Sequence, residues 1–344
     1  MSELGSKRHE LPESLDDVYD YVMRQGWGDG LPIVPPTEDR VQGMLDYTGR
    51  APGEVVARVA PLDGEATVEK IAVNAVMAGC RPEYLPVVIA AVEAMAAPEF
   101  HLGGIQTTTN PVGPVLIING PARQKLNVNC ALGCMGPGWR ANATIGRAVR
   151  LVLLNIGGGA PDTVDRAIHG MPGKYTFCFG EDEEGSPWAP LHVERGCDRA
   201  ASAVTVTGGQ GTHNNITNVP SPELFIKLIA NAMSTWGNNN MAFTQGEPLV
   251  VLTSAHAAIL AKAGFTKSKL KEAIFALAGA PVTDYPAAVA TPSKPMFVLD
   301  GLVKPCEKPE DIMVVVTGSP VPYHIVVIPT FGDTRAVTRQ IKEP

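Results

Sequence analysis

Several features that mark common protein classes are absent from this sequence. No apolar run reaches about 18 residues, so a transmembrane helix is not expected. The polar start MSELGSKRHELPESLDD lacks the apolar segment of a signal peptide, so export is not expected either. The phosphate-binding pattern G-x-x-x-x-G-K-[ST] and the redox pattern C-x-x-C do not occur. These absences leave a globular protein of the cytoplasm as the expectation.

A strongly basic surface is also missing. The 344 residues include 28 Lys and Arg against 35 Asp and Glu, and the net charge is −7. Because the cationic residues are scattered, neither nucleic acid nor an anionic membrane is expected as a partner. Small molecules or other proteins remain as the expected partners. The six cysteines, in the absence of a secretory signal, are expected to be reduced thiols.

Helical and strand patterns alternate along the chain, which is typical of an α/β fold. Helices are predicted over 14–25 with Ser14 as N-cap, over 37–47, and over 67–79 with Gly79 at the end. Many strands are continuous apolar runs, which predicts that both of their faces are covered. The predicted strands are VVARVAP, PVLIING, KYTFCFG, ASAVTVTGG, PLVVLTS, PMFVLDG, DIMVVVTG and HIVVIP.

Two parts of the chain resemble each other. PEYLPVVIAAVEAM matches PELFIKLIANAM, GPVLIING matches EPLVVLTS, and TIGRAVRLVLL matches KLKEAIFALAG, in the same order. We interpret each copy as helix, strand, short helix and helix, and predict duplicated units packed about a pseudo-twofold axis with mixed sheets. The alternative is that unrelated units align by composition. Three segments are expected: a helical part at 1–50, a first α/β unit at 51–170, and a second unit with C-terminal strands at 171–344.

The longest difference between the copies is the run NVNCALGCMGPGW, which carries Cys130 and Cys134. Four interpretations are open for this Cys loop. The spacing C-x-x-x-C weakens a redox pair, and a zinc site finds only His101 nearby in sequence. A Gly-rich loop before a helix favours a catalytic thiolate, because backbone N–H groups lower a thiol pKa and hold an oxyanion. The remaining interpretation is a tight turn that contains two sulfurs.

Two polar loops occupy corresponding places in the copies, and we predict that they bind substrate. Their amides and hydroxyls suit a carboxylate or an amide, although Thr side chains also satisfy their own backbone in ordinary loops. We expect these loops and the Cys loop to border one pocket between the copies. The residues are Gln106, Thr107, Thr108, Thr109 and Asn110 in the first copy, and Asn238, Asn239 and Asn240 in the second.

A third patch, TGGQGTHNNITN, follows a predicted strand. His213 is the candidate general acid or base there, and Asn214 and Asn215 are candidate substrate-binding amides. The same run is also typical of a Gly-rich turn with a surface histidine, and it is not G-x-G-x-x-G, so a nucleotide is not expected. A further run, GEDEEGSPW, is interpreted as a solvated acidic turn.

Three phrases of the sequence form a set: DGLPIVPPTEDRV, AGCRPEYLPVVIAAVEAM and ANATIGRAVRLVLLNIGG. On these phrases, most of the chain resembles a conserved bacterial protein family of undefined activity. The resemblance implies a soluble bacterial protein. It implies no reaction and supplies no catalytic residue.

The residues together favour an enzyme that acts on a small polar substrate. Cys130 or Cys134 would be the thiolate and His213 the acid or base, in a hydrolase, a lyase or a thiol transferase. No cofactor or metal is implied. One alternative is an accessory or binding subunit of a heteromeric enzyme, and another is a metal-dependent lyase that uses His101 and His213. The expected partner is a small molecule, and both a homo-oligomer and a partner subunit remain open.

Overall fold

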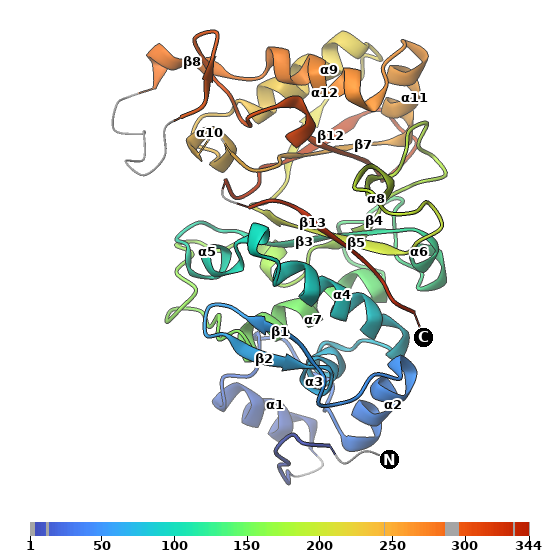
Figure 1. Ribbon diagram of the computed structural model, residues 1–344, viewed down its shortest axis with the longest axis vertical. Helices are drawn as coiled ribbons and strands as arrows, with labels where there is room; N and C mark the ends of the chain where they lie inside the picture. The colour runs from blue at the N-terminus through green and yellow to red at the C-terminus, as the bar shows by residue number, and fades with distance from the viewer. Residues whose placement is uncertain (1–3, 12–13, 244, 286–295, 333, 344) are drawn as a thin grey trace.

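The computed structural model describes residues 4–11, 14–243, 245–285, 296–332 and 334–343. These residues form an α/β structure with twelve α-helices and several mixed sheets, so the predicted α/β class is confirmed. Two four-stranded sheets pack face to face, and helices cover the outer face of each. Figure 1 shows these layers stacked along the long axis, with the N-terminal helices at the lower end.

The two sheets repeat one arrangement of strands. In each, a central strand pairs in parallel with one neighbour and antiparallel with the other, and a fourth strand pairs antiparallel with the latter. The first sheet has the order β13 (Val337–Gln340), β5 (Ala203–Gly209), β3 (Gly113–Asn119) and β4 (Cys178–Gly180). The second has the order β11 (Met313–Val316), β7 (Leu249–Leu252), β12 (His324–Ile328) and β6 (His213–Ile216).

The fourth strands are exchanged between the sheets. Strand β6 directly follows β5 along the chain but pairs with β12 of the second sheet. Strand β13 directly follows β12 but pairs with β5 of the first sheet. The first sheet therefore contains strands from both sides of the unit boundary expected at residue 170.

The central strands are buried on both faces, as their continuous apolar sequences predict. Side chains alternate between the faces of a strand. On β3, Leu116 and Ile118 face the helices, whereas Val115 and Ile117 face the second sheet and share a core with Leu249. This inner core between the sheets explains why both central strands lack an alternating polar pattern.

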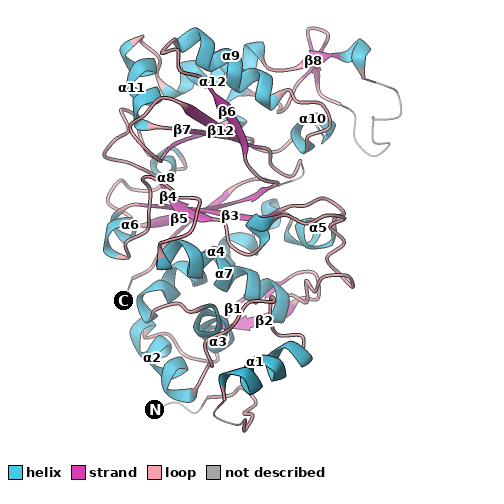
Figure 2. Cartoon of the chain, turned by 180° about the vertical axis from the view of Figure 1, so that it is seen from behind, coloured by secondary structure: helices cyan, strands magenta, loops and turns pink. Residues whose placement is uncertain are grey.

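Helices α4 (Leu85–Met95) and α7 (Arg140–Asn155) lie on the first sheet, and α2 (Glu38–Thr48) and α3 (Val68–Ala78) pack on them in a further layer (Figure 2). The helices over the second sheet are α9 (Pro222–Met233), α11 (Ser254–Lys262) and α12 (Lys267–Leu277). The remaining helices are α1 (Leu15–Arg24), α5 (Leu102–Thr107), α6 (Pro121–Lys125), α8 (Leu191–Glu194) and α10 (Asn239–Phe243). Smaller sheets pair β1 (Val55–Val59) with β2 (Gly64–Thr67), and β10 (Leu302–Val303) with β8 (Ala280–Pro281) and β9 (Val298–Leu299).

Local signals place the ends of several helices where the sequence predicts them. The Ser14 hydroxyl accepts a hydrogen bond from the Asp17 N–H at the start of α1. Thr67 caps α3 in the same way, and Gly79 ends that helix at φ 91°, a conformation that favours glycine. The predicted N-cap Thr37 stands before α2, but its side chain makes no capping hydrogen bond.

Within the described ranges, no single helix is long and apolar enough to cross a membrane. The bent pair Pro82–Met95 and Pro98–Thr107, with an angle of 79° between its halves, passes the length and composition test as a pair. Ten of the eleven residues of α4 in this pair are buried inside the protein.

Some strands differ from the sequence predictions. Strand β4 comprises only the end of the predicted run KYTFCFG. Strands β2, β6 and β13 were not predicted, because their polar residues give no apolar alternation. Within the run PMFVLDG, Pro295 lies outside the described residues, and β9 forms farther along it.

Candidate functional site

The structure divides the predicted site residues between the two ends of β3. Gly113, at the start of this strand, pairs with Gly209, and Asn119, at its end, pairs with Ala203. The loop 106–110 leads into the first end, and the run 207–218 follows Gly209 there. The Cys loop leaves from the other end through α6 (Figure 1).

The expectation that these loops border one pocket is therefore wrong. The short helix α6 has five residues and rises about 7.5 Å, whereas the seven residues of β3 span about 20 Å. The residues that follow α6 also stay at the end of β3, because the Asn129 carbonyl accepts from Gly180 N–H at the end of the parallel strand β4. Cys130 and His213 consequently do not share a site.

The side chains of the loop 106–110 bond to their own surroundings. Gln106 is buried, and its Nε2 lies 3.5 Å from the Leu153 carbonyl. Thr107 donates to the Gly103 carbonyl, and the Thr108 hydroxyl accepts from both the backbone N–H and the Nδ2 of Asn110. The Thr109 carbonyl accepts from Ile168 N–H. These contacts match the alternative of an ordinary polar loop.

The asparagines of the second copy also serve the fold. Asn240 is buried, accepts from Thr330 N–H at 2.8 Å and donates to the Gln245 carbonyl. The Asn238 side chain caps α10 by accepting from Met241 N–H. Asn239 is buried, and its Nδ2 has no partner among the described atoms. Substrate binding by these residues stays a prediction without a contact that favours it.

His213 lies exposed on the edge strand β6 and pairs with Val327. Asn214 Nδ2 lies 3.1 Å from His324 Nδ1, and Asn215 Nδ2 donates to the His213 carbonyl. His101 lies at the start of α5. No cluster of three or more His, Cys, Asp or Glu side chains in the described part of the chain is suited to a metal ion.

Asn142, in the first turn of α7, holds the Cys loop in shape. Its Oδ1 accepts from Asn129 N–H at 2.8 Å, and its Nδ2 donates to the carbonyls of Asn129 and Cys134 at 3.0 Å each. All three bonds are buried. One amide thus joins the middle of the loop to the helix that follows it.

The Cys loop also reaches the second sheet. The Cys130 carbonyl accepts from Gly318 N–H and from the Thr317 hydroxyl, both at 2.8 Å and both beyond the end of β11. The Thr317 oxygen also lies 3.2 Å from Cys134 Sγ. Asp182 N–H, after the end of β4, donates to the Val316 carbonyl. The loop therefore sits where the carboxyl ends of β4 and β11 meet, at the junction of the two sheets.

Arg123 from α6 lies beside the Cys130 thiol. The Arg123 side chain is only 6% exposed, and its Nη1 lies 3.2 Å from Cys130 Sγ. Its Nη2 donates to both oxygens of Glu184, at 2.5 and 2.7 Å. A Cβ on Gly180 would lie 2.9 Å from the Arg123 side chain and 3.2 Å from Cys130 Cβ, so only glycine leaves room for this pair.

The run 181–184 is a turn, as expected, but it is solvated only in part, with the Glu184 side chain 59% exposed and the other acids partly or fully buried. Glu183 accepts from Gly120 N–H and from Asn119 Nδ2, and Glu184 binds Arg123. Glu181 is completely buried; its Oε2 accepts from Leu191 N–H and Asn119 Nδ2, both at 2.7 Å. Burial raises the pKa of Glu181, against the opposing charge of Lys267 at 3.8 Å.

These carboxylates are the residues that sequence reasoning missed. A run of four acids between glycines looks the same whether it faces water or partners. The polar residue Asn119 at the end of the buried strand β3, Arg123 in the helix that follows it, and Lys267 all contact the run, and they are the signals that the sequence offered. No periodicity links such distant positions.

Burial raises the pKa of the Cys130 thiol, and the contact with Arg123 opposes that shift. The carboxylates of Asp182 and Glu184 add to the rise. Burial also raises the pKa of Cys134, and the Thr317 hydroxyl opposes it. The expectation of a lowered thiol pKa is therefore wrong, because the loop encloses the sulfurs more than its backbone donors stabilise their charge.

A small cationic hollow lies where the Cys loop begins and ends. It has a volume of about 140 Å³ and is lined by Leu126 and Asn127 on one side and by Arg140 and Ala141 on the other. Further lining residues are Arg81, Glu83, Tyr84 and Lys125. Tyr84 is 4% exposed, and its hydroxyl makes no hydrogen bond within the described structure. The hollow thus offers cations, one free hydroxyl and the start of α7 to an anionic group.

Comparisons with known proteins assign no family to this geometry. No protein-family model matches the chain, and no curated protein matches it either. The bacterial resemblance stays a prediction. The functional argument therefore rests on the residues of the Cys loop and their neighbours.

Proposed function

We propose that this chain is an enzyme that acts on a small polar substrate through the thiol of Cys130. The observation that carries the proposal is the 3.2 Å contact between Cys130 Sγ and Arg123 Nη1. The sulfur is only partly buried, whereas the guanidinium is held in place by Glu184. An ordinary structural cysteine needs no buried cation beside it.

The resting thiol is neutral in this proposal, because its pKa is raised. Reaction requires the loss of its proton to a basic group of the substrate or to solvent, because Glu184 is bound to Arg123 and its pKa is lowered. Once formed, the thiolate accepts a charge-assisted hydrogen bond from Arg123. This chemistry is compatible with a hydrolase, a lyase or a thiol transferase, and it does not use His213.

A substrate with a carboxylate is supported by the cationic hollow at the base of the loop. Arg81 and Arg140 line it together with the free hydroxyl of Tyr84, while Lys125 is shared with Glu343. An anion bound there would lie between the two ends of the loop that carries the thiol. We place the protein in the cytoplasm, where its six free cysteines stay reduced.

We also propose that the two α/β units arose by duplication. The order α4, β3, α6 and α7 matches α9, β7, α11 and α12, and both sheets repeat one set of strand directions. The test is a superposition of residues 82–154 on 222–278. Equivalent helices that leave their strands in unrelated directions would contradict the proposal.

One observation favours the second candidate function, an accessory subunit. Leu132, at the tip of the Cys loop, is 68% exposed. A partner subunit would cover this side chain, although a single exposed leucine is also ordinary on a protein surface. Replacing Leu132 by Ser would weaken assembly with a partner subunit in this alternative, whereas it would leave Cys130 chemistry unchanged in the enzyme.

The thiol proposal is tested by alkylation with iodoacetamide and mass spectrometry between pH 7 and 10. Cys130 should react before the four buried cysteines, and its rate should rise about tenfold per pH unit below its raised pKa. Arg123→Gln should slow Cys130 at each pH because the thiolate loses its donor. Arg40→Gln, far from the loop in sequence, is the matched control.

Succinate serves as the anionic competitor in the same experiment. Protection of Cys130 by succinate, and its loss in Arg140→Gln, would support a substrate carboxylate in the hollow. Labelling of Cys130 no faster than that of the buried Cys178 would contradict the proposed function.

A further inference from the structure

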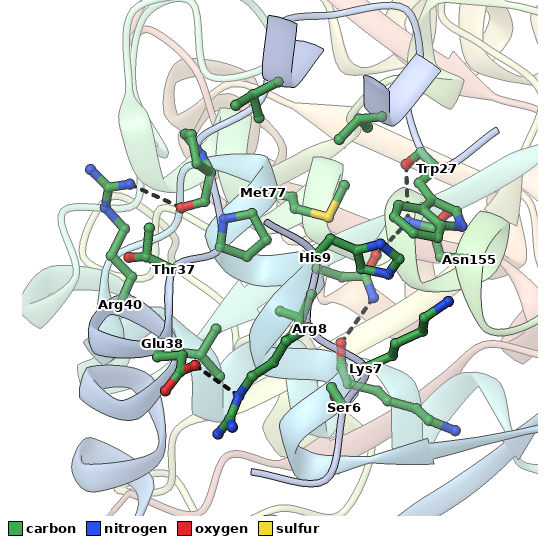
Figure 3. A pocket seen from close by; sticks show the side chains of 18 of the residues that line it. Ser6, Lys7, Arg8, His9, Trp27, Thr37, Glu38, Arg40, Met77 and Asn155 are labelled. Atoms are coloured by element: carbon green, nitrogen blue, oxygen red, sulfur yellow. Dashed lines mark hydrogen bonds and ion pairs between the residues drawn. The ribbon is translucent and has the colours of Figure 1, made fainter. Parts of the chain in front are cut away.

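A separate cavity of about 870 Å³ lies in the N-terminal part of the molecule. Its walls come from the segment before α1, from α1 itself, from the starts of α2 and α3, and from the end of α7. In Figure 3, Arg40 and Glu38 lie on one side of this cavity and Trp27 and Asn155 on the other, with His9 between them. Its volume is in the range of cavities that bind small molecules.

This cavity is distinct from the Cys site. Asn155 and Ile156, which line it, stand at the C-terminal end of α7, whereas the Cys loop precedes the N-terminal end. The helix has 16 residues and is about 24 Å long. One ligand of ordinary size therefore does not reach both places.

Much of the cavity wall is apolar and aromatic. Val22 of α1 and both Val73 and Met77 of α3 contribute aliphatic surface. His9 and Tyr21 both pack against Trp27, with ring centroids 5.3 and 6.0 Å apart. Such a wall favours the flat or aliphatic body of an organic molecule.

The wall is fixed in place before any ligand binds. Both oxygens of Asp29 accept from Arg147 of α7 at 2.8 Å, and the Trp27 carbonyl accepts from Asn155 Nδ2 at 3.1 Å. The N-terminal segment is held from the other side, because Gly5 N–H and Ser6 N–H donate to the carboxylate of Glu69. A preformed cavity loses little entropy on binding.

The two carboxylates of the wall already have partners. Glu38 lies 2.7 Å from Arg8, and Glu69 accepts the two backbone bonds just described. Those hydrogen bonds hold the pKa of Glu69 below its ordinary value although burial opposes them. Glu69 keeps its negative charge, so the wall holds four cationic side chains against two carboxylates.

Three cations of the wall have no carboxylate partner within the described residues. Arg40 donates to the Pro35 carbonyl and Lys70 to the Glu65 carbonyl, and Lys7 makes no ion pair there. The chain as a whole has a net charge of −7. An excess of cations over carboxylates around an apolar cavity is therefore a local exception that favours negative charge.

We propose that this cavity binds an organic anion with an apolar body, such as an aromatic sulfonate or a medium-chain carboxylate. The anionic group contacts Lys7, Arg40 or Lys70, and the body lies against Trp27 and the aliphatic wall. The site is independent of the chemistry proposed at Cys130.

The probe is 8-anilinonaphthalene-1-sulfonate, titrated into the full chain while its fluorescence and that of tryptophan are recorded. We expect saturable binding of one probe molecule with quenching of Trp27, and loss of that quenching in Trp27→Phe. The double variant Lys7→Glu, Arg40→Glu should weaken binding about tenfold. Lys262→Glu, an exposed charge change on α11, is the matched control and should bind like the wild type.

Dodecanoate should compete with the probe, and dodecanol should compete less, because only the former carries the anion. Equal affinity of the wild type and the double variant, or equal competition by the acid and the alcohol, would overturn the proposal. Probe binding should be unchanged in Cys130→Ser, so failure here is distinguishable from failure of the proposed enzyme function.

Discussion

The connections that follow β3 and β7 differ although both strands occupy the central position of their sheets. After β7, the nine residues of α11 lead through 263–266 directly into α12. Gly264 turns the chain at φ 88°, and Thr266 caps α12 by accepting from Lys269 N–H. After β3, the chain passes through the five residues of α6 and then through the Cys loop at 126–139.

The two connections are stabilised by different kinds of contact. Residues within a few positions of each other close most of the connection after β7, and one distant bond runs from Trp188 Nε1 to the Phe265 carbonyl. The Cys loop depends on Asn142, 13 residues beyond Asn129, and on Thr317, 187 residues beyond Cys130. Within the loop, the Asn129 side chain accepts from Ala131 N–H and donates to the Leu132 carbonyl, so the thiol of Cys130 is left free for chemistry.

The largest expected effect comes from Asn142→Ala. Three buried hydrogen bonds are lost, and the groups they satisfied stay buried, so the free energy of unfolding should fall by about 3 kcal/mol. Urea denaturation measures this. Lys269→Ala, at the same position of the first turn of α12, is the matched control and should stay within about 0.5 kcal/mol of the wild type. Equal losses of unfolding free energy in the two variants would contradict the difference between the two connections.

A smaller effect is expected from Thr317→Val. Valine keeps the shape but removes the hydroxyl that bonds to Cys130 and Gly180, so stability should fall by about 1–2 kcal/mol. Alkylation of Cys134 should become faster because the loop opens toward the second sheet. Thr163→Val removes an exposed hydroxyl and should change neither quantity. An unaltered Cys134 rate would show that the second sheet does not hold the loop.

The smallest effect is expected from Thr266→Ala in the other connection. Loss of its capping bond to Lys269 N–H should lower the free energy of unfolding by about 1 kcal/mol. Alkylation of Cys130 and Cys134 should not change, because this connection makes no contribution to the Cys loop. A faster thiol reaction in this variant would mean that the two connections are coupled.

The central parts of the fold could be predicted from the sequence because their causes are local. Ser14 and Thr67 cap helices through neighbours three residues away, and the apolar runs of β3 and β7 predict burial on both faces. Strand β6 could not be predicted, since His213 and its polar neighbours pair only because β12 offers an edge.

The candidate site could be predicted only in part. An unusual loop drew attention to Cys130, but its partners come from three other segments of the chain. The grouping of His213 with the thiols was wrong because it assumed the path of the chain after β3. The path of the chain after β3 depends on the length of α6, and the spacing of residues in the sequence does not predict that length.

The exchange of β6 and β13 between the sheets has a consequence for synthesis on the ribosome. Thr205 of β5 meets its partner Thr338 only after 133 further residues have been added, which takes roughly ten seconds at typical rates of translation. Until then, the edge of β5 that β13 covers stays open, and all seven residues of β5 are destined for burial. Open apolar edges of this kind attract other strands. We therefore expect the nascent chain to expose this edge for longer than a protein of the same size whose sheets pair in the order of synthesis.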